Sequence, residues 1–125
     1  MTVDRVIPML RIFDVAKAKE FYVEYLGFKL EWEHRIFEGS PLVMEVSRGG
    51  LSLMLTEHHG DCCPGAAISI WLSGLDAFHS ELRSKKYAYL NPGIEDAPWG
   101  SRLMRVFDPF GNKILFNEKR PGMTK

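Results

Sequence analysis

The sequence lacks an excess of charge of either sign and has almost no cysteine. Its 16 lysines and arginines balance 16 aspartates and glutamates, so no broad electrostatic field attracts nucleic acid or an anionic membrane. The cysteines are the adjacent Cys62 and Cys63, which are poorly placed to bridge each other. We therefore expect two loop thiols in a protein of the reducing cytoplasm, with no nucleic-acid partner.

Long apolar runs are missing as well. No segment approaches the ~20 apolar residues that span a bilayer, and Met1–Arg5 has neither the basic nor the apolar region of a secretory signal. The sequence therefore predicts neither a membrane span nor a signal peptide. What it does contain is 46% hydrophobic residues in a chain of 125, which suits a single globular domain with its own core.

The first half of the chain predicts one helix among four strands. The helix is expected over 15–26, with Asp14 as N-cap and Gly27 as a left-handed C-terminal residue. The strands are expected over 6–13, 28–37, 42–47 and 51–57, the last two joined by a Gly49-Gly50 turn. In the second strand, alternation predicts one face formed by Phe28, Leu30, Trp32, His34 and Ile36.

The second half repeats this order. We expect a strand over 66–72, a helix capped by Ser73 with Asp76, a weak strand over 87–90 and a hairpin over 102–116. Strand, helix and three strands, twice over, indicate an internal duplication. The predicted fold class is therefore α+β, with two βαβββ repeats at about 4–58 and 66–117 in one domain, 1–117, and a flexible tail, 118–125. Each repeat leaves an apolar sheet face that needs a cover.

Three stretches of the sequence resemble one known superfamily. They are Ile7-Pro8-Met9-Leu10-Arg11 with the Leu26-Gly27-Phe28 that follows, Ile70-Trp71-Leu72-Ser73-Gly74, and Pro98-Trp99-Gly100 followed after seven residues by Asp108-Pro109-Phe110-Gly111-Asn112. Together they resemble the glyoxalase/bleomycin-resistance (vicinal oxygen chelate) superfamily, and most closely its bleomycin-resistance branch. The resemblance implies a cupped mixed β-sheet with helices on its outer face, and a homodimer whose two chains share their clefts.

The resemblance also locates where a metal would bind. Many enzymes of the superfamily hold a divalent ion with His, Gln or Glu on the first, fourth, fifth and eighth strands. The corresponding positions here are Ile7, Met54, Ala67 and Leu115. None supplies the oxygen or nitrogen donor that such an ion needs, so we expect no metal, no cofactor and no metal-dependent catalysis. His58–Cys63 has metal-binding residue types without a recognised spacing, and we interpret it as a polar loop.

Aromatic residues are the candidates for a binding site. The resemblance matches four of them to the rings that line the drug-binding crevice of the bleomycin-resistance branch: Trp32, Phe37, Trp71 and Trp99. Such rings stack on planar groups and attract cations. His34, on the expected face of Trp32, is a donor that titrates near neutrality. Arg102, beside the Trp99 loop, is a candidate for binding a carboxylate or phosphate.

These features favour a binding protein over an enzyme. Our leading hypothesis is a metal-free, dimeric protein that sequesters an aromatic or glycopeptide drug or metabolite, such as a bleomycin-like compound. The first alternative is a superfamily lyase or dioxygenase with a divalent metal at non-standard positions. The second is a non-catalytic module that binds a metabolite or a partner protein. Glu45 and Glu57 lie on neighbouring expected strands, but nothing in the sequence predicts that they form an acid–base pair.

Overall fold

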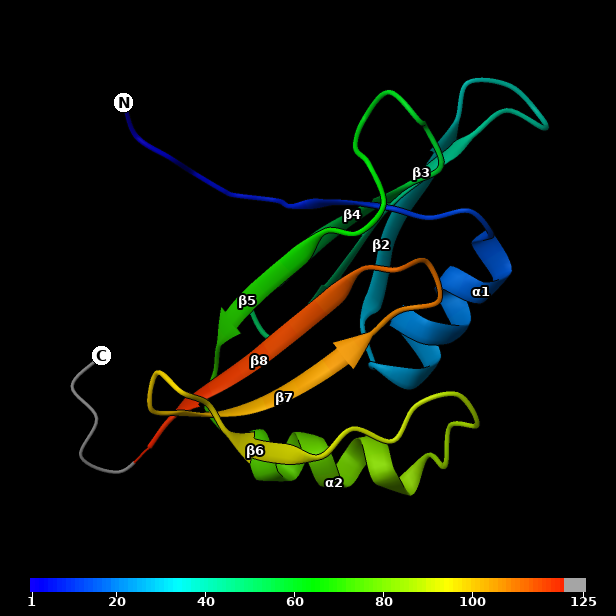
Figure 1. Ribbon diagram of the computed structural model, residues 1–125. Helices are drawn as coiled ribbons and strands as arrows, with labels where there is room; N and C mark the ends of the chain where they lie inside the picture. The colour runs from blue at the N-terminus through cyan, green and yellow to red at the C-terminus, as the bar shows by residue number, and fades with distance from the viewer. Residues whose placement is uncertain (121–125) are drawn as a thin grey trace. The chain divides into compact units, whose positions relative to one another are not determined.

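The computed structural model describes residues 1–120, which divide into two compact units. The first unit contains Met1–Ala66 together with the turn Pro109–Asn112. The second unit contains Ala67–Asp108 and the strand that begins at Lys113. Within the described residues, each unit runs strand, helix and three strands, and its strands form one four-stranded sheet (Figure 1).

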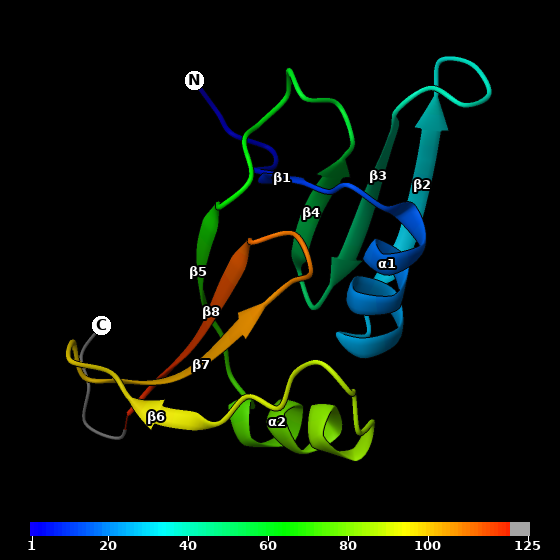
Figure 2. The same ribbon diagram turned by 45° about the vertical axis from the view of Figure 1, so that its right-hand side comes forward.

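The first unit is built from β1 (Met9–Arg11), α1 (Val15–Lys19), η1 (Glu20–Tyr25), β2 (Lys29–Arg35), β3 (Leu42–Arg48) and β4 (Leu51–Thr56). Its strand order is β1-β4-β3-β2, with β1 parallel to β4 and the other pairs antiparallel (Figure 2). β1 is shorter than the strand expected over 6–13. Pro8 has no N–H to donate to the ladder, although its carbonyl accepts the Met54 N–H at 2.9 Å.

The helix of the first unit begins and ends where the sequence predicts. The Asp14 carboxylate accepts the Lys17 N–H at 2.8 Å, and Gly27 adopts a φ of 76°. Between these ends the helix changes its winding, because η1 is a π-helix in which the Leu26 N–H bonds to the Phe21 carbonyl at 2.9 Å. The spacing of apolar residues predicts a helix here but does not distinguish these two windings.

β2 departs from the strict alternation that its sequence suggests. Leu30 pairs with Val46 and Trp32 pairs with Glu45, so two steps along β2 match one step along β3. After this bulge, the alternation of β2 is reversed, so that residues expected on one face of the sheet point to the other. Leu30 lies on the face of the buried Val46, whereas Trp32 and His34 lie on the opposite face. The prediction that Phe28 and Leu30 share a face with Trp32 and His34 is therefore wrong.

The second unit is built from β5 (Ala67–Trp71), α2 (Leu75–Ser84), β6 (Ile94–Asp96), β7 (Ser101–Phe107) and β8 (Lys113–Lys119). Its strand order, β5-β8-β7-β6, repeats the topology of the first unit. α2 packs on one face of this sheet, where Phe78 contacts Phe116 edge-on at 5.1 Å between ring centroids. The strand expected over 87–90 is absent, because this part of the described chain forms a turn and β6 begins later.

The start of α2 is also different from the expectation. Its N-cap is Gly74 at a φ of 85°, without a side-chain cap of its own. The Glu118 carboxylate from β8 instead accepts the N–H groups of Gly74 and Leu75, at 2.9 and 3.0 Å. The capping pair of Ser73 with Asp76 is therefore wrong. Glu118 and Lys119 also belong to β8 rather than to the expected tail, whose last residues, 121–125, lie outside the described part.

The α+β fold class with two βαβββ repeats is confirmed by both units. Over residues 1–120, no helix combines the length and the apolar composition needed to cross a bilayer.

Candidate functional site

The first unit presents Trp32 and His34 on the sheet face opposite its helix. On the helix side, Lys19 of α1 forms an ion pair with Glu33 at 2.9 Å. On the other side, Trp32 is 42% exposed, and its indole N–H donates to Oε1 of Glu45 on β3 at 3.0 Å. The ring is thus held at one edge while much of its surface faces solvent. We call Trp32, His34 and Glu45 the Trp32 site.

Glu45 is the charged anchor of this site. Its side chain is 7% exposed, and its second oxygen forms an ion pair with Arg5, which lies ahead of β1. The hydrogen bond from Arg5 lowers the pKa of the Glu45 carboxyl below its ordinary range, assisted by Trp32 and opposed by burial. Glu45 is therefore an ionised hydrogen-bond acceptor at neutral pH. The sequence suggests Glu45 only as half of an acid–base pair with Glu57, not as a hydrogen-bond anchor.

Phe37 lies beyond the end of β2, in the loop to β3. It is 67% exposed. Its backbone is held by Ser40, whose hydroxyl accepts the Phe37 N–H at 3.1 Å and donates to the Phe37 carbonyl at 2.6 Å. The loop is therefore a closed turn with its aromatic side chain outside. The structure places Phe37 in the same unit as Trp32, on a different element.

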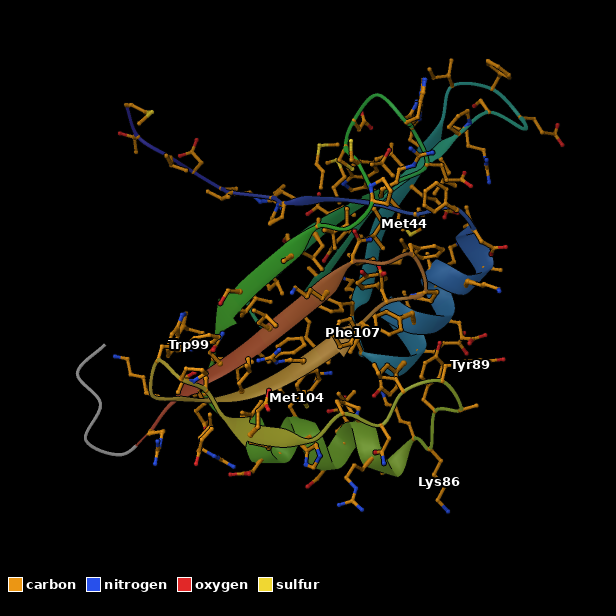
Figure 3. The ribbon with its side chains drawn as sticks, in the orientation of Figure 1. Met44, Lys86, Tyr89, Trp99, Met104 and Phe107 are labelled. Carbon is orange, nitrogen blue, oxygen red and sulfur yellow. The ribbon has the colours of Figure 1, made fainter. Side chains whose placement is uncertain are left out.

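The second unit gathers Trp71 and Trp99 around Asn117. Trp71 ends β5 and is the register partner of Asn117 on β8. Trp99 lies in the loop from β6 to β7 (Figure 3), and its indole N–H donates to Asn117 Oδ1 at 3.2 Å. Trp99 is 50% exposed. We call Trp71, Trp99 and Asn117 the Trp99 site.

Asn117 is the functional candidate that sequence reasoning missed. It is fully buried, and its Oδ1 also accepts the Ser101 hydroxyl at 2.9 Å while its Nδ2 donates to the Ser69 hydroxyl at 2.9 Å. One amide thus joins three strands and the Trp99 loop. The available signal was a polar side chain directly after the apolar run Ile114–Phe116, because a buried Asn needs partners for both amide atoms.

Arg102 is not brought to the Trp99 site. Its guanidinium donates to Asp76 of α2 at 2.7 and 2.9 Å and to Glu118 at 3.0 Å. These bonds raise the pKa of Arg102, and the same contact lowers the pKa of the Asp76 carboxyl. Arg102 therefore links the start of α2 to β8, and the Glu118 that it holds is the cap of that helix.

The positions that would hold the superfamily metal do not fit one. Met54 lies on β4, Ala67 on β5 and Leu115 on β8, and Ile7 precedes β1. Their alkyl and thioether groups offer no donor suited to a divalent ion of this kind. Across residues 1–120, no group of three His, Cys, Asp or Glu side chains is placed to hold a metal.

The carboxylates of the first unit are not arranged as an acid–base pair. Glu45 is engaged by Arg5 and Trp32. Glu57 accepts the Leu42 N–H at 2.9 Å and lies 3.7 Å from Arg35. Each group has its own partners, so these carboxylates support positioning of other groups. What both sites offer instead is partly exposed indole surface held in one orientation.

Comparison with known proteins agrees with this architecture. A family model described as glyoxalase superfamily protein matches residues 1–123. No curated protein matches the sequence significantly. Among solved structures, the fold resembles a bleomycin-binding protein complexed with bleomycin, with 23% identity, a TM-score of 0.68, and coverage of 94% of this chain and 100% of that one.

Two further solved structures show the same fold. TnmS3, an antibiotic-binding protein from Streptomyces sp. CB03234, is 25% identical with a TM-score of 0.72, over 96% of this chain and 99% of that one. A bleomycin resistance determinant encoded on the transposon Tn5 is 21% identical with a TM-score of 0.69, over 94% of this chain and 99% of that one. Since the family model covers nearly the whole sequence, the chain belongs to the glyoxalase superfamily.

Proposed function

We propose that this protein binds and sequesters a planar aromatic small molecule, such as a bleomycin-like drug or a metabolite with a similar ring system, without transforming it. The observation that carries the proposal is the way the indoles are held. Trp32 and Trp99 each donate their N–H to a buried acceptor, Glu45 or Asn117, and leave about half of the side chain exposed.

Ring surfaces held in this way bind at a low entropic cost. The hydrogen bond at the ring edge already restricts the side-chain rotamers, so less freedom is lost when a ligand stacks on the ring. Each stacking contact contributes ~0.5–1.5 kcal/mol beyond its buried area. His34 and Phe37 complete the proposed contact surface of the first unit, and Trp71 completes that of the second. The printed names of the related structures, which include a bleomycin complex and an antibiotic-binding protein, support this class of ligand.

The proposal includes a homodimer in which the open sheet faces form the crevice. An exposed sheet face that carries large apolar side chains is stabilised by a cover, and a second copy of the chain would supply one. Sedimentation velocity at several protein concentrations tests this part. A species of one chain throughout the concentration range would contradict it and leave ligand binding to be judged separately.

Calorimetric titration with metal-free bleomycin tests the binding itself. We expect saturable heat at about one drug per chain, and a loss of ~10-fold or more in affinity for Trp99→Ala and Trp32→Ala. Tyr89→Ala is the matched control, because Tyr89 is an exposed ring in the loop after α2 (Figure 3). Absence of heat with the wild type would rule out bleomycin. Equal losses in all three variants would rule out the two indole sites.

A further inference from the structure

The first unit contains a cavity that is separate from the Trp32 site, because no residue of that site lines it. Its volume is about 300 Å³. It lies where β1, β2 and β4 end and the β2–β3 loop begins, a loop that extends beyond the strands in Figure 2. Its walls are formed by Arg11, Ile12, Phe13, Arg35, Gly39, Ser40, Pro41 and Glu57.

Arg11 is the unusual member of this set. Its side chain is only partly exposed, and its Nε is buried without a hydrogen-bond partner. The guanidinium lies over the Phe13 ring, 4.6 Å from the centroid. No hydrogen bond or ion pair joins the Arg11 side chain to another group of residues 1–120. The buried Nε has no accessible surface, so the terminal nitrogens, which also have no partner in this part of the chain, are the donors that can bind a group supplied from outside.

The other charges at the cavity offset one another. Arg35 donates to the Ser40 carbonyl and lies 3.7 Å from Glu57, whose Oε1 also accepts the Leu42 N–H. Asp61 lies outside the cavity wall, where its carboxylate accepts the Thr56 hydroxyl at 2.7 Å. Among the residues that line the cavity, Arg11 is therefore the positive charge without a carboxylate partner.

We propose that this cavity binds a small organic oxyanion, a carboxylate or a phosphate ester that carries a planar apolar group. The Arg11 guanidinium would take the oxyanion through its two terminal nitrogens, a two-bond geometry that lysine does not offer. Phe13 and Pro41 supply apolar surface for the rest of the molecule. The volume is at the lower end of the range for ligand pockets, which suits a single ring. The site does not depend on the proposed drug-binding function.

Binding at this site can be followed by nitrogen–proton NMR, through the chemical shift of the Arg11 Nε–H resonance. Benzoate is expected to shift the Arg11 resonance saturably, whereas benzamide, its neutral counterpart, leaves the resonance unchanged at the same concentration. Phenyl phosphate and inorganic phosphate distinguish the sources of the oxyanion. Tighter binding of phenyl phosphate supports the site as described, and equal binding of the two overturns the apolar part. An Arg11 resonance that is not shifted by about 50 mM benzoate, or that is shifted equally by benzamide, overturns the proposal, because charged hydrogen bonds of this kind produce measurable affinity.

Variants then test the role of the guanidinium. Arg11→Gln is expected to weaken benzoate binding, followed by calorimetry, ~10-fold or more, and Arg11→Lys by less, because it keeps the charge and loses the fork. Arg83→Gln, on the exposed side of α2, is the control and is expected to bind as the wild type does. Wild-type affinity in Arg11→Gln would overturn the proposal. If Arg11→Gln does not fold, Arg11→Lys and the benzoate–benzamide comparison decide.

Discussion

The two units solve the same problem of holding a tryptophan with different chemistry. In the first unit, the Trp32 indole donates to a buried carboxylate, Glu45, whose charge is offset by Arg5. In the second, the Trp99 indole donates to a buried neutral amide, Asn117, whose remaining bonds go to uncharged groups. Both indoles remain about half exposed. The units share a topology, yet only one of them has an anchor that titrates.

This difference separates the properties of the two sites. A charged anchor responds to pH and salt, because the carboxylate titrates and because it forms an ion pair with an exposed arginine. A neutral anchor does not, but it depends on every hydrogen bond being made, because a buried amide left unpaired is costly. The Trp32 site should therefore be sensitive to solution conditions, and the Trp99 site to substitution.

The largest expected effect is at the neutral anchor. Asn117→Leu keeps the approximate volume but leaves the buried Ser101 hydroxyl and the Trp99 N–H without their acceptor. We expect a loss of ~2–4 kcal/mol in the free energy of unfolding, measured by urea denaturation. Ser69→Ala, which removes one bond of the same amide from an exposed partner, is the control and should cost less than ~1 kcal/mol. Equal losses in the two variants would show that Asn117 does not organise the site.

The second largest effect is the loss of stability when either indole is replaced by phenylalanine. Trp99→Phe removes the N–H and leaves Asn117 Oδ1 with the Ser101 hydroxyl alone, and we expect a loss of ~0.5–1.5 kcal/mol in stability. Trp32→Phe should cost less, because Glu45 retains its ion pair with Arg5. Urea denaturation of both variants at pH 7 and moderate salt measures the difference. A larger loss for Trp32→Phe would reverse the comparison.

The smallest expected effect is in acid. The pKa of Glu45 is lowered in the folded protein, so its contribution to stability is fully present above the ordinary carboxyl pKa of ~4.3 and is lost as the pH falls through the lowered value. In a protein whose only tryptophan is Trp32, the emission should change in this acidic range. It should not change in the same protein carrying Glu45→Gln.

A protein whose only tryptophan is Trp99 is the control for that titration. Asn117 carries no proton that titrates in this range, so the emission of Trp99 should stay constant until the protein unfolds. A transition of equal size and midpoint at both indoles would indicate global acid unfolding rather than titration of Glu45. It would remove the distinction between the charged and the neutral anchor.

Local chemistry predicted the parts of the fold that depend on neighbours in sequence. Asp14 caps the helix three residues before the N–H that it accepts, and Gly27 ends the helix with a positive φ. The hairpin around Asp108–Gly111 follows from turn chemistry of the same kind. The prediction of a weak strand over 87–90 is wrong, because alternation over four residues is too short a signal to outweigh the turn that forms there.

The candidate site was predicted in its aromatic residues and missed in their anchors. Trp32, Trp71 and Trp99 could be selected because a large ring in a resembling motif is visible in the sequence. Glu45 and Asn117 could not be recognised as their partners, since the hydrogen bonds join residues 13 and 18 positions apart. Glu118 as the cap of α2 is a still more distant case, because it lies 44 positions from Gly74.

The sequence by itself determined the α+β class, the repeated order of strands and helices, and both ends of the helix in the first unit, because these follow from periodicity and from contacts within a few residues. Only the tertiary structure decided which face Trp32 occupies, what holds each indole, and that Arg102 serves the start of α2. A bulge is defined by the register between two strands, and a buried polar group takes its partners from whichever strands lie beside it. Both depend on pairing between distant segments, which local patterns do not specify.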